Sequence, residues 1–233
     1  MDPREPAAVS AARGTERPGA QQWVPPDADV DALRAAAPGC RGCELWADAT
    51  QVVVSAGGAR ARLVLVGEQP GDQEDRAGEP FVGPAGRVLD DALEAAGIAR
   101  ADVYVTNAVK HFRFTLPERG TRRLHKKPGV PHVDACRPWL AAELAAVRPD
   151  VVVCLGATAA RSVLGEDVAV SGVRGRVLDE VPVVGAPDAP PRVVVTAHPS
   201  AVLRLRGREG WDEAFAALVA DLRVAAEAVT GTR

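Results

Sequence analysis

Four short runs of aliphatic and β-branched residues dominate the hydropathy pattern, and each is bounded by polar or glycine-rich segments. Apolar runs of this length are typical of parallel strands that are buried on both faces of a sheet. The pattern therefore predicts four buried strands, at Arg62–Val66, Val103–Thr106, Asp150–Leu155 and Arg192–Thr196.

Apolar residues recur with helical spacing between these runs and at both ends of the folded region. Helices are expected at Val30–Ala37, Ala85–Ala96, Val133–Val147, Ala157–Leu164 and Asp212–Val229. Gly172–Val184 alternates weakly and predicts an edge hairpin. Strands that alternate with helices indicate a three-layer α/β/α fold with a central four-stranded parallel sheet.

The first 26 residues differ in composition from the rest of the chain. They are rich in Pro, Ala, Gln and Gly without periodicity, which predicts a disordered N-terminal arm (1–26) before one folded domain (27–233). No apolar targeting segment or membrane span is present in the pattern, so we expect a cytoplasmic protein.

The formal net charge of -3 argues against a surface that is basic overall. One excursion is nevertheless strongly basic, because 112–129 contains Arg119, Arg122, Arg123, His125, Lys126 and Lys127. Its simplest interpretation is a solvated loop that grips phosphates.

Unusual polar segments follow three of the four predicted strands. They are Gly67–Gly71, Asn107–Phe112 and His198–Ser200. Ligands of open α/β sheets bind beyond the carboxyl ends of the strands, so this convergence locates a candidate site.

Individual residues of these segments suggest binding chemistry, each with a simpler alternative. Glu68 and Gln69, beside Gly67, either point into the crevice or form a polar turn. Phe81, in a Gly/Pro-rich loop, either stacks on a base or anchors its loop. The Asn107 amide suits the edge of a nucleobase.

His198 and Ser200 close the series of strand-end residues. His198 would face the crevice, and Ser200 is expected to cap a helix at Ala201–Leu205, where its hydroxyl and the helix N-terminus would bind a phosphate.

Four cysteines form the second informative pattern. Cys40 and Cys43 form a single CxxC pair outside the predicted sheet, whereas Cys136 and Cys154 stand alone in a helix and a strand. Thiolates bind either zinc or an iron–sulfur cluster, and one CxxC pair with two single ligands favours the cluster. Cys136 and Cys154 are alternatively buried core cysteines.

Together these segments resemble the uracil-DNA glycosylase superfamily, in particular its iron–sulfur branch. GEQPG, EPFVGPAG, TNAVKHF, the four cysteines and HPS occur in the family's order between Cys40 and Leu222. TRRLH, at Thr121–His125, is similar to the KRRIH loop of family X, which bonds covalently to uracil-containing DNA. Thr121 and Leu124 depart from that loop, and Gln69 stands where family 4 commonly has Ala.

The resemblance implies a uracil-DNA glycosylase that carries a [4Fe-4S] cluster on Cys40, Cys43, Cys136 and Cys154. It implies that Phe81 stacks on the flipped uracil, Asn107 reads its edge and His198 donates to its O2. Glu68 and Gln69 would complete the catalytic set with Gly67, and His125 would attack C1′ of the sugar. Arg123 and Ser200 would hold the flanking phosphates.

The expected partner is uracil-containing DNA, preferably single-stranded, bound by a monomer without a membrane. Two alternatives remain open: an ordinary family 4-type glycosylase that turns over, and a non-enzymatic iron–sulfur DNA-binding protein.

Overall fold

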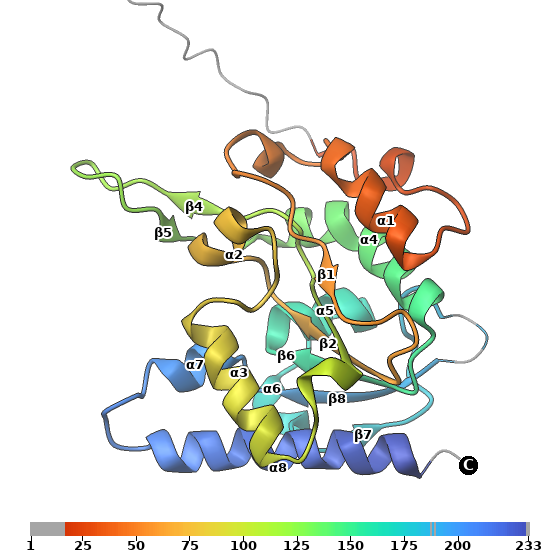
Figure 1. Cartoon of the computed structure of the whole chain (residues 1–233), viewed down its shortest axis with the longest axis vertical. Helices are drawn as coiled ribbons and strands as arrows, with labels where there is room; N and C mark the ends of the chain where they lie inside the picture. The colour runs from red at the N-terminus through yellow and green to blue at the C-terminus, as the bar shows by residue number, and fades with distance from the viewer. Residues whose placement is uncertain (1–16, 187, 189, 232–233) are drawn as a thin grey trace, which may run out of the picture.

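A six-stranded, mainly parallel sheet forms the centre of the molecule (Figure 1). The computed structural model describes residues 17–186, 188 and 190–231. In sheet order the strands are β1 (Ser55–Ala56), β3 (Val103–Asn107), β2 (Leu63–Gly67), β6 (Val151–Leu155), β8 (Arg192–Thr196) and β7 (Val177–Leu178). The four predicted strands are the parallel ones, and β1 and β7 add antiparallel edges.

Helices cover both faces of the sheet, so the predicted three-layer fold is confirmed. Alternate residues of each strand face opposite layers: Leu65 packs toward α3 and α8, and Val64 packs toward α4 and α5. The helices are α3 (Pro84–Ala95), α7 (Pro199–Leu203) and α8 (Trp211–Thr230) on the first face, with α4 (Val130–Val147) and α5 (Ala157–Leu164) on the second. Among the described residues, no helix has the length and apolarity needed to cross a membrane.

A smaller cluster of buried residues lies outside the sheet, against the first part of α4. It combines α1 (Val30–Ala36) with the short helical turns at Gln21–Trp23, Ala37–Gly39 and Glu44–Ala47. The prediction that the disordered arm extends to residue 26 is wrong for 17–26. Ala20 is buried, and its N–H donates to the Ala135 carbonyl at 2.8 Å. The remainder of the predicted arm, 1–16, lies outside the described residues.

The basic excursion forms a two-stranded hairpin that projects from the body beside α2 (Asp72–Ala77) (Figure 1). Its strands are β4 (Phe114–Thr115) and β5 (Leu124–His125), and Phe114 pairs with His125. The predicted edge hairpin at Gly172–Val184 is instead a short helix, α6 (Val170–Val173), followed by β7. A further helical turn, Arg100–Asp102, precedes β3.

Candidate active site

The carboxyl ends of β2 and β3 meet where Gly67 pairs with Asn107. A Cβ atom on Gly67 would lie 2.3 Å from Asn107 Oδ1 and 2.6 Å from the Phe81 ring. Neither contact is tolerable, so the missing side chain makes room for these two groups. The space beside Gly67 is therefore occupied by two of the side chains expected to contact a ligand.

Phe81 is held in a strained backbone conformation, with φ at 60°. The Glu74 carboxylate fixes the loop around it, accepting the Gly83 N–H at 2.8 Å and the Gly71 N–H at 3.1 Å. The Phe81 ring lies 6.3 Å from the His198 ring, centroid to centroid, at an interplanar angle of 28°. The loop thus directs an aromatic face toward the end of β8.

Glu68 is held by a residue that the sequence analysis missed. Thr158, at the start of α5, donates its hydroxyl to Glu68 Oε2 at 2.5 Å. The other carboxylate oxygen lies 3.7 Å from His125 Nε2. The segment Gly156–Thr158 directly follows β6, just as the three recognised segments follow their strands. This position after a predicted strand is the feature of the sequence from which Thr158 could have been identified.

Gln69 connects the hairpin to the strand ends. Its Oε1 accepts the Arg113 N–H at 3.2 Å, and the two hydrogens of its Nε2 are shared among the carbonyls of Arg113 and Lys126, at 3.1 and 3.2 Å, and the His125 ring. These contacts fix the orientation of the amide, so the group that faces His125 Nε2 at 3.0 Å is the NH₂ donor. His125 Nε2 therefore accepts and carries a lone pair, and its side chain remains 49% exposed.

His198 has the opposite arrangement of its two ring nitrogens. Its Nδ1 accepts the Ser200 N–H at 3.1 Å, so a neutral ring carries its proton on Nε2. Burial lowers the pKa of His198 to about 4, with smaller contributions from His125 and Arg204. Near neutral pH this side chain is a neutral donor through Nε2.

The predicted phosphate role of Ser200 is not supported by its contacts. The residue that caps α7 is His198, and Ser200 lies inside the helix. Its hydroxyl lies 2.8 Å from His198 Nδ1, so it orients that ring.

Arg123 is likewise held within the protein, so its contacts do not support the prediction that it binds a phosphate. Its guanidinium donates to Asp72 at 2.5 Å and to the fully buried Asp75 at 2.6 Å. It also lies over the rings of Phe112 and Phe114. Arg123 therefore fastens the hairpin to α2, and only 13% of its side chain is exposed.

Three of the four cysteines gather in the smaller cluster. Cys40, Cys43 and Cys136 are buried together, and the Trp139 indole N–H donates to Cys40 Sγ at 3.3 Å. Burial raises the pKa of Cys43 to about 11 and that of Cys136 to about 12. Cys40 influences both thiols, and Cys43 influences Cys136, as expected for neighbours.

Cys154 does not join them, so the predicted set of four ligands is not assembled. It lies in the middle of the sheet, between Val66 and Val195, and belongs to the core under α4 and α5. Burial alone raises the pKa of its thiol, without a contribution from another cysteine. Its alternative interpretation, a core cysteine, describes this environment.

His111 is the residue near the cysteines that the sequence analysis did not single out. It is buried, and its ring forms no hydrogen bond within the described part of the chain. The preceding residue, Lys110, donates its N–H to Cys136 Sγ at 3.3 Å, and Arg41 of the CxxC loop influences the pKa of His111. Burial lowers that pKa to about 4, so the ring is neutral and has a free lone pair.

The three cysteines and His111 are suitable ligands for a cluster. In the described ranges, no three His, Cys, Asp or Glu side chains are close enough to hold a single metal ion. A cluster is larger than an ion and needs ligands that stand further apart. Soft thiolates in an apolar, buried setting suit iron–sulfur chemistry.

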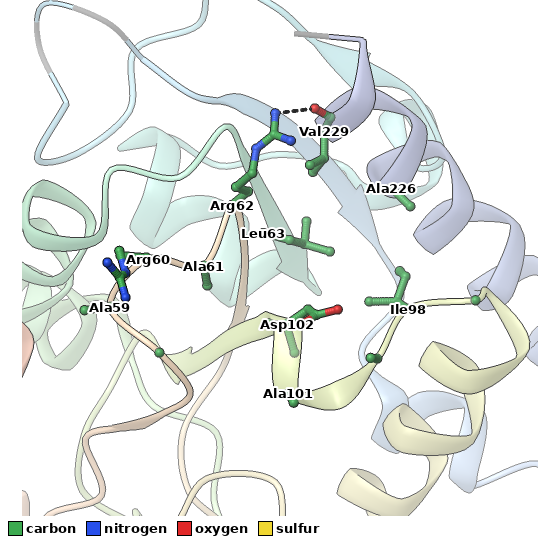
Figure 2. Close-up of a pocket in the computed structure, with 14 residues that line it drawn as sticks. Ala59, Arg60, Ala61, Arg62, Leu63, Ile98, Ala101, Asp102, Ala226 and Val229 are labelled. Carbon is green, nitrogen blue, oxygen red and sulfur yellow. Dashed lines mark hydrogen bonds between the residues drawn. The ribbon is translucent and has the colours of Figure 1, made fainter.

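A hollow of about 730 Å³ lies at the opposite edge of the sheet (Figure 2). It is lined by Leu63 and Val103, the first residues of β2 and β3. Arg62 donates to the Val229 carbonyl at 2.7 Å there and also pairs with Asp150. The hollow is lined by none of the groups at the carboxyl ends of the strands, so we do not assign the chemistry to it.

At the carboxyl ends the site combines a neutral donor, a carboxylate, an imidazole with a lone pair on Nε2 and an aromatic face. A donor and a carboxylate on neighbouring strands can stabilise opposite charges that develop as a bond breaks. An imidazole lone pair beside them can capture the resulting cation.

Comparison with known proteins gives the same family as the motifs. Residues 54–223 match the model of the uracil DNA glycosylase superfamily. The chain is 38% identical over 171 residues to the type-4 uracil-DNA glycosylase of Thermotoga maritima, covering 73% of this chain and 81% of that protein. It is 36% identical over 181 residues to the type-4 uracil-DNA glycosylase of Archaeoglobus fulgidus, covering 76% and 84%.

Proposed function

Because the chain belongs to the uracil-DNA glycosylase superfamily, we propose that it removes uracil from DNA and that His125 then captures the sugar covalently. The observation that carries the covalent step is the position of His125 Nε2. This atom accepts from the Gln69 amide at 3.0 Å and lies 3.7 Å from the Glu68 carboxylate.

A uracil in a base stack is out of reach of these groups, so the nucleotide is first flipped out of the stack. Phe81 stacks on the flipped ring, and the Asn107 amide pairs with its N3–H and O4 edge. The amide is available for this role because it forms no hydrogen bond within the described residues. Flipping costs less from an unpaired strand, which supports a preference for single-stranded DNA.

The N-glycosidic bond then breaks, and its electron pair leaves with the uracil. His198 donates from Nε2 to uracil O2 as negative charge develops, a contact that contributes about 3–4 kcal/mol in comparable sites. Glu68, held by Thr158, stabilises the sugar cation. The lone pair of His125 Nε2 forms the new bond to C1′, and the ring loses its Nδ1 proton to solvent.

We further propose that the cluster is held by Cys40, Cys43, Cys136 and His111. Two observations support this ligand set. The four side chains are buried beside the turn that follows β3, and Cys154 lies apart from them in the sheet. When bound, the cluster supplies a rigid crosslink between the CxxC loop, α4 and the turn after β3. DNA phosphates are assigned to exposed cations of the hairpin, Arg122, Lys126 and Lys127.

The test is a denaturing gel after incubation with single-stranded DNA that contains one uracil. The wild type is expected to give a heat- and SDS-stable protein–DNA band, and thymine in place of uracil should give none. His125→Ser should lose the band but still release uracil, because Glu68 and His198 remain.

Two outcomes would overturn the proposal. Release of uracil by the wild type without a band would indicate an ordinary glycosylase that turns over. Salt-dependent DNA binding without release would indicate a non-enzymatic DNA-binding protein. The same assay with a duplex substrate tests the strand preference.

A further inference from the structure

A fully buried ion pair contacts the carboxyl end of β3, where Asn107 is proposed to recognise the base. Lys110 and Glu143 have no exposed side-chain surface, and the Lys110 ammonium is bonded to the Glu143 carboxylate. The ammonium also donates to Thr106 Oγ1 at 2.5 Å and to the Asn107 carbonyl at 2.9 Å. Its three donors are thereby all used.

Glu143 is anchored independently of Lys110. Its Oε1 accepts from the Tyr104 hydroxyl at 3.0 Å and lies 3.0 Å from Thr106 Oγ1. An isolated pair of buried charges is commonly no more stable than apolar residues of similar size. Stability alone therefore gives little reason for a charged pair here, and the contact with Asn107 suggests another role.

The turn from Asn107 to Lys110 is fastened to α4 at two points. The Lys110 N–H donates to Cys136 Sγ at 3.3 Å, and the Lys110 ammonium reaches Glu143 further along the same helix. Lys110 thus connects the cysteine cluster to the Asn107 backbone. No hydrogen bond from the described residues orients the Asn107 amide, so its direction depends on that backbone and on contact with Gly67.

We infer that Lys110 is a positioning residue for base recognition: through the Asn107 carbonyl it holds the Asn107 amide in the orientation that pairs with uracil. This inference rests on the proposed uracil excision. A shift of the carbonyl would move the amide relative to Phe81 and His198, and misplacement of a contact in the transition state lowers the rate.

The decisive variants are Lys110→Met and Lys110→Met combined with Glu143→Gln. The single variant leaves a buried, unpaired carboxylate and should be unstable, whereas the double variant removes both charges and keeps an acceptor for Tyr104. We expect its thermal midpoint to recover toward that of the wild type. Its single-turnover rate of uracil release should stay at least about tenfold low, with little change in DNA affinity.

Tyr104→Phe is the matched control. It removes one bond to Glu143 without touching Asn107, so it should lower the thermal midpoint and leave the rate unchanged. Iron content should equal that of the wild type in all three variants, because the Lys110 N–H to Cys136 is retained. Equal iron content separates an effect on Asn107 from loss of the cluster.

A mutant cycle with Asn107→Ala tests the route of the effect. If Lys110 acts through Asn107, the double variant's loss of rate should largely disappear in the Asn107→Ala background. A wild-type rate in the stable double variant, or a loss that is fully additive with Asn107→Ala, would overturn the inference. Absence of uracil release by the wild type would instead overturn the proposed function.

Discussion

His125 and His198 differ in which ring nitrogen is free of a proton, and neighbouring donors set the difference. The Gln69 amide donates to His125 Nε2, and the Ser200 N–H donates to His198 Nδ1. The first ring therefore has its lone pair on Nε2, which lies 3.7 Å from a Glu68 carboxylate oxygen, and the second has its proton on Nε2. One residue type thus supplies both the proposed nucleophile and the proposed donor in a single site.

Gln69→Ala is expected to impair capture more than excision. It removes the contacts with the hairpin carbonyls and with His125, while Glu68 and His198 keep their own partners. The ratio of crosslinked protein to free uracil should fall by about tenfold, the scale of about 1.4 kcal/mol of lost positioning. Gln51→Ala, which removes a glutamine bonded to carbonyls of α2, is the control. An unchanged ratio in Gln69→Ala would contradict its role.

The lowered pKa of His198 predicts a pH dependence of stability. The unfolded ring titrates near 6.5 and the folded ring near 4. Between these values the unfolded state binds the additional proton, so the free energy of unfolding falls as the pH falls. The urea midpoint of the wild type should therefore drop more between pH 7 and pH 5 than that of His198→Gln. Equal drops would show that the folded ring titrates normally.

At the scale of elements, the hairpin carries His125, the proposed nucleophile, and the orientation of the hairpin depends on α2. Arg123 is bonded to Asp72 and Asp75 of α2, and Gln69 bridges the two hairpin strands beside β2. The ladder between the two hairpin strands comprises only four residues, so it contributes little to the stability of the hairpin. These outside contacts hold His125 at the site.

Arg123→Gln should loosen the hairpin without removing a phosphate contact. Amide hydrogen exchange over 114–127 should rise, and the crosslinking rate should fall. The slope of log Kd against log salt should stay as in the wild type. Arg122→Gln, an adjacent and exposed cation, should reduce that slope by about 1. A reduced slope for Arg123→Gln would restore its phosphate role.

The sequence predicted elements well where burial determines residue type. The four parallel strands are apolar on both faces, and their runs were recognised within one residue at each end. The hairpin lacked such a pattern because its two-residue strands are held by side chains distant in sequence. The local charge pattern likewise predicted that Arg123 binds phosphate. Its actual partners, Asp72 and Asp75, lie about 50 residues away in the chain, so the composition around Arg123 does not indicate them.

At the scale of the whole molecule, the structure joins a sheet with a separate cysteine cluster. Cys154 was assigned to that cluster because spacing cannot tell which way a strand residue faces. Residues 17–26 were assigned to the arm because composition does not register Ala20 packing against α4. Lys110 is the residue at which the two parts meet.

The proposed ligand set predicts iron content variant by variant. Cys154→Ala should retain the iron of the wild type, with a modest loss of stability from a smaller core side chain. Cys136→Ala and His111→Ala should lose iron and visible absorption after anaerobic purification. Loss of iron from Cys154→Ala, or retention of iron by His111→Ala, would contradict the assigned ligands. Stoichiometric zinc in the wild type would contradict the iron–sulfur cluster itself.

The most direct measurement of the central claim is peptide mapping by mass spectrometry after reaction with a short uracil-containing single strand. The account predicts that the peptide containing His125 gains the mass of the abasic strand and that fragmentation locates the adduct on this imidazole. An adduct on another residue, or free uracil with an unmodified His125 peptide, would contradict it.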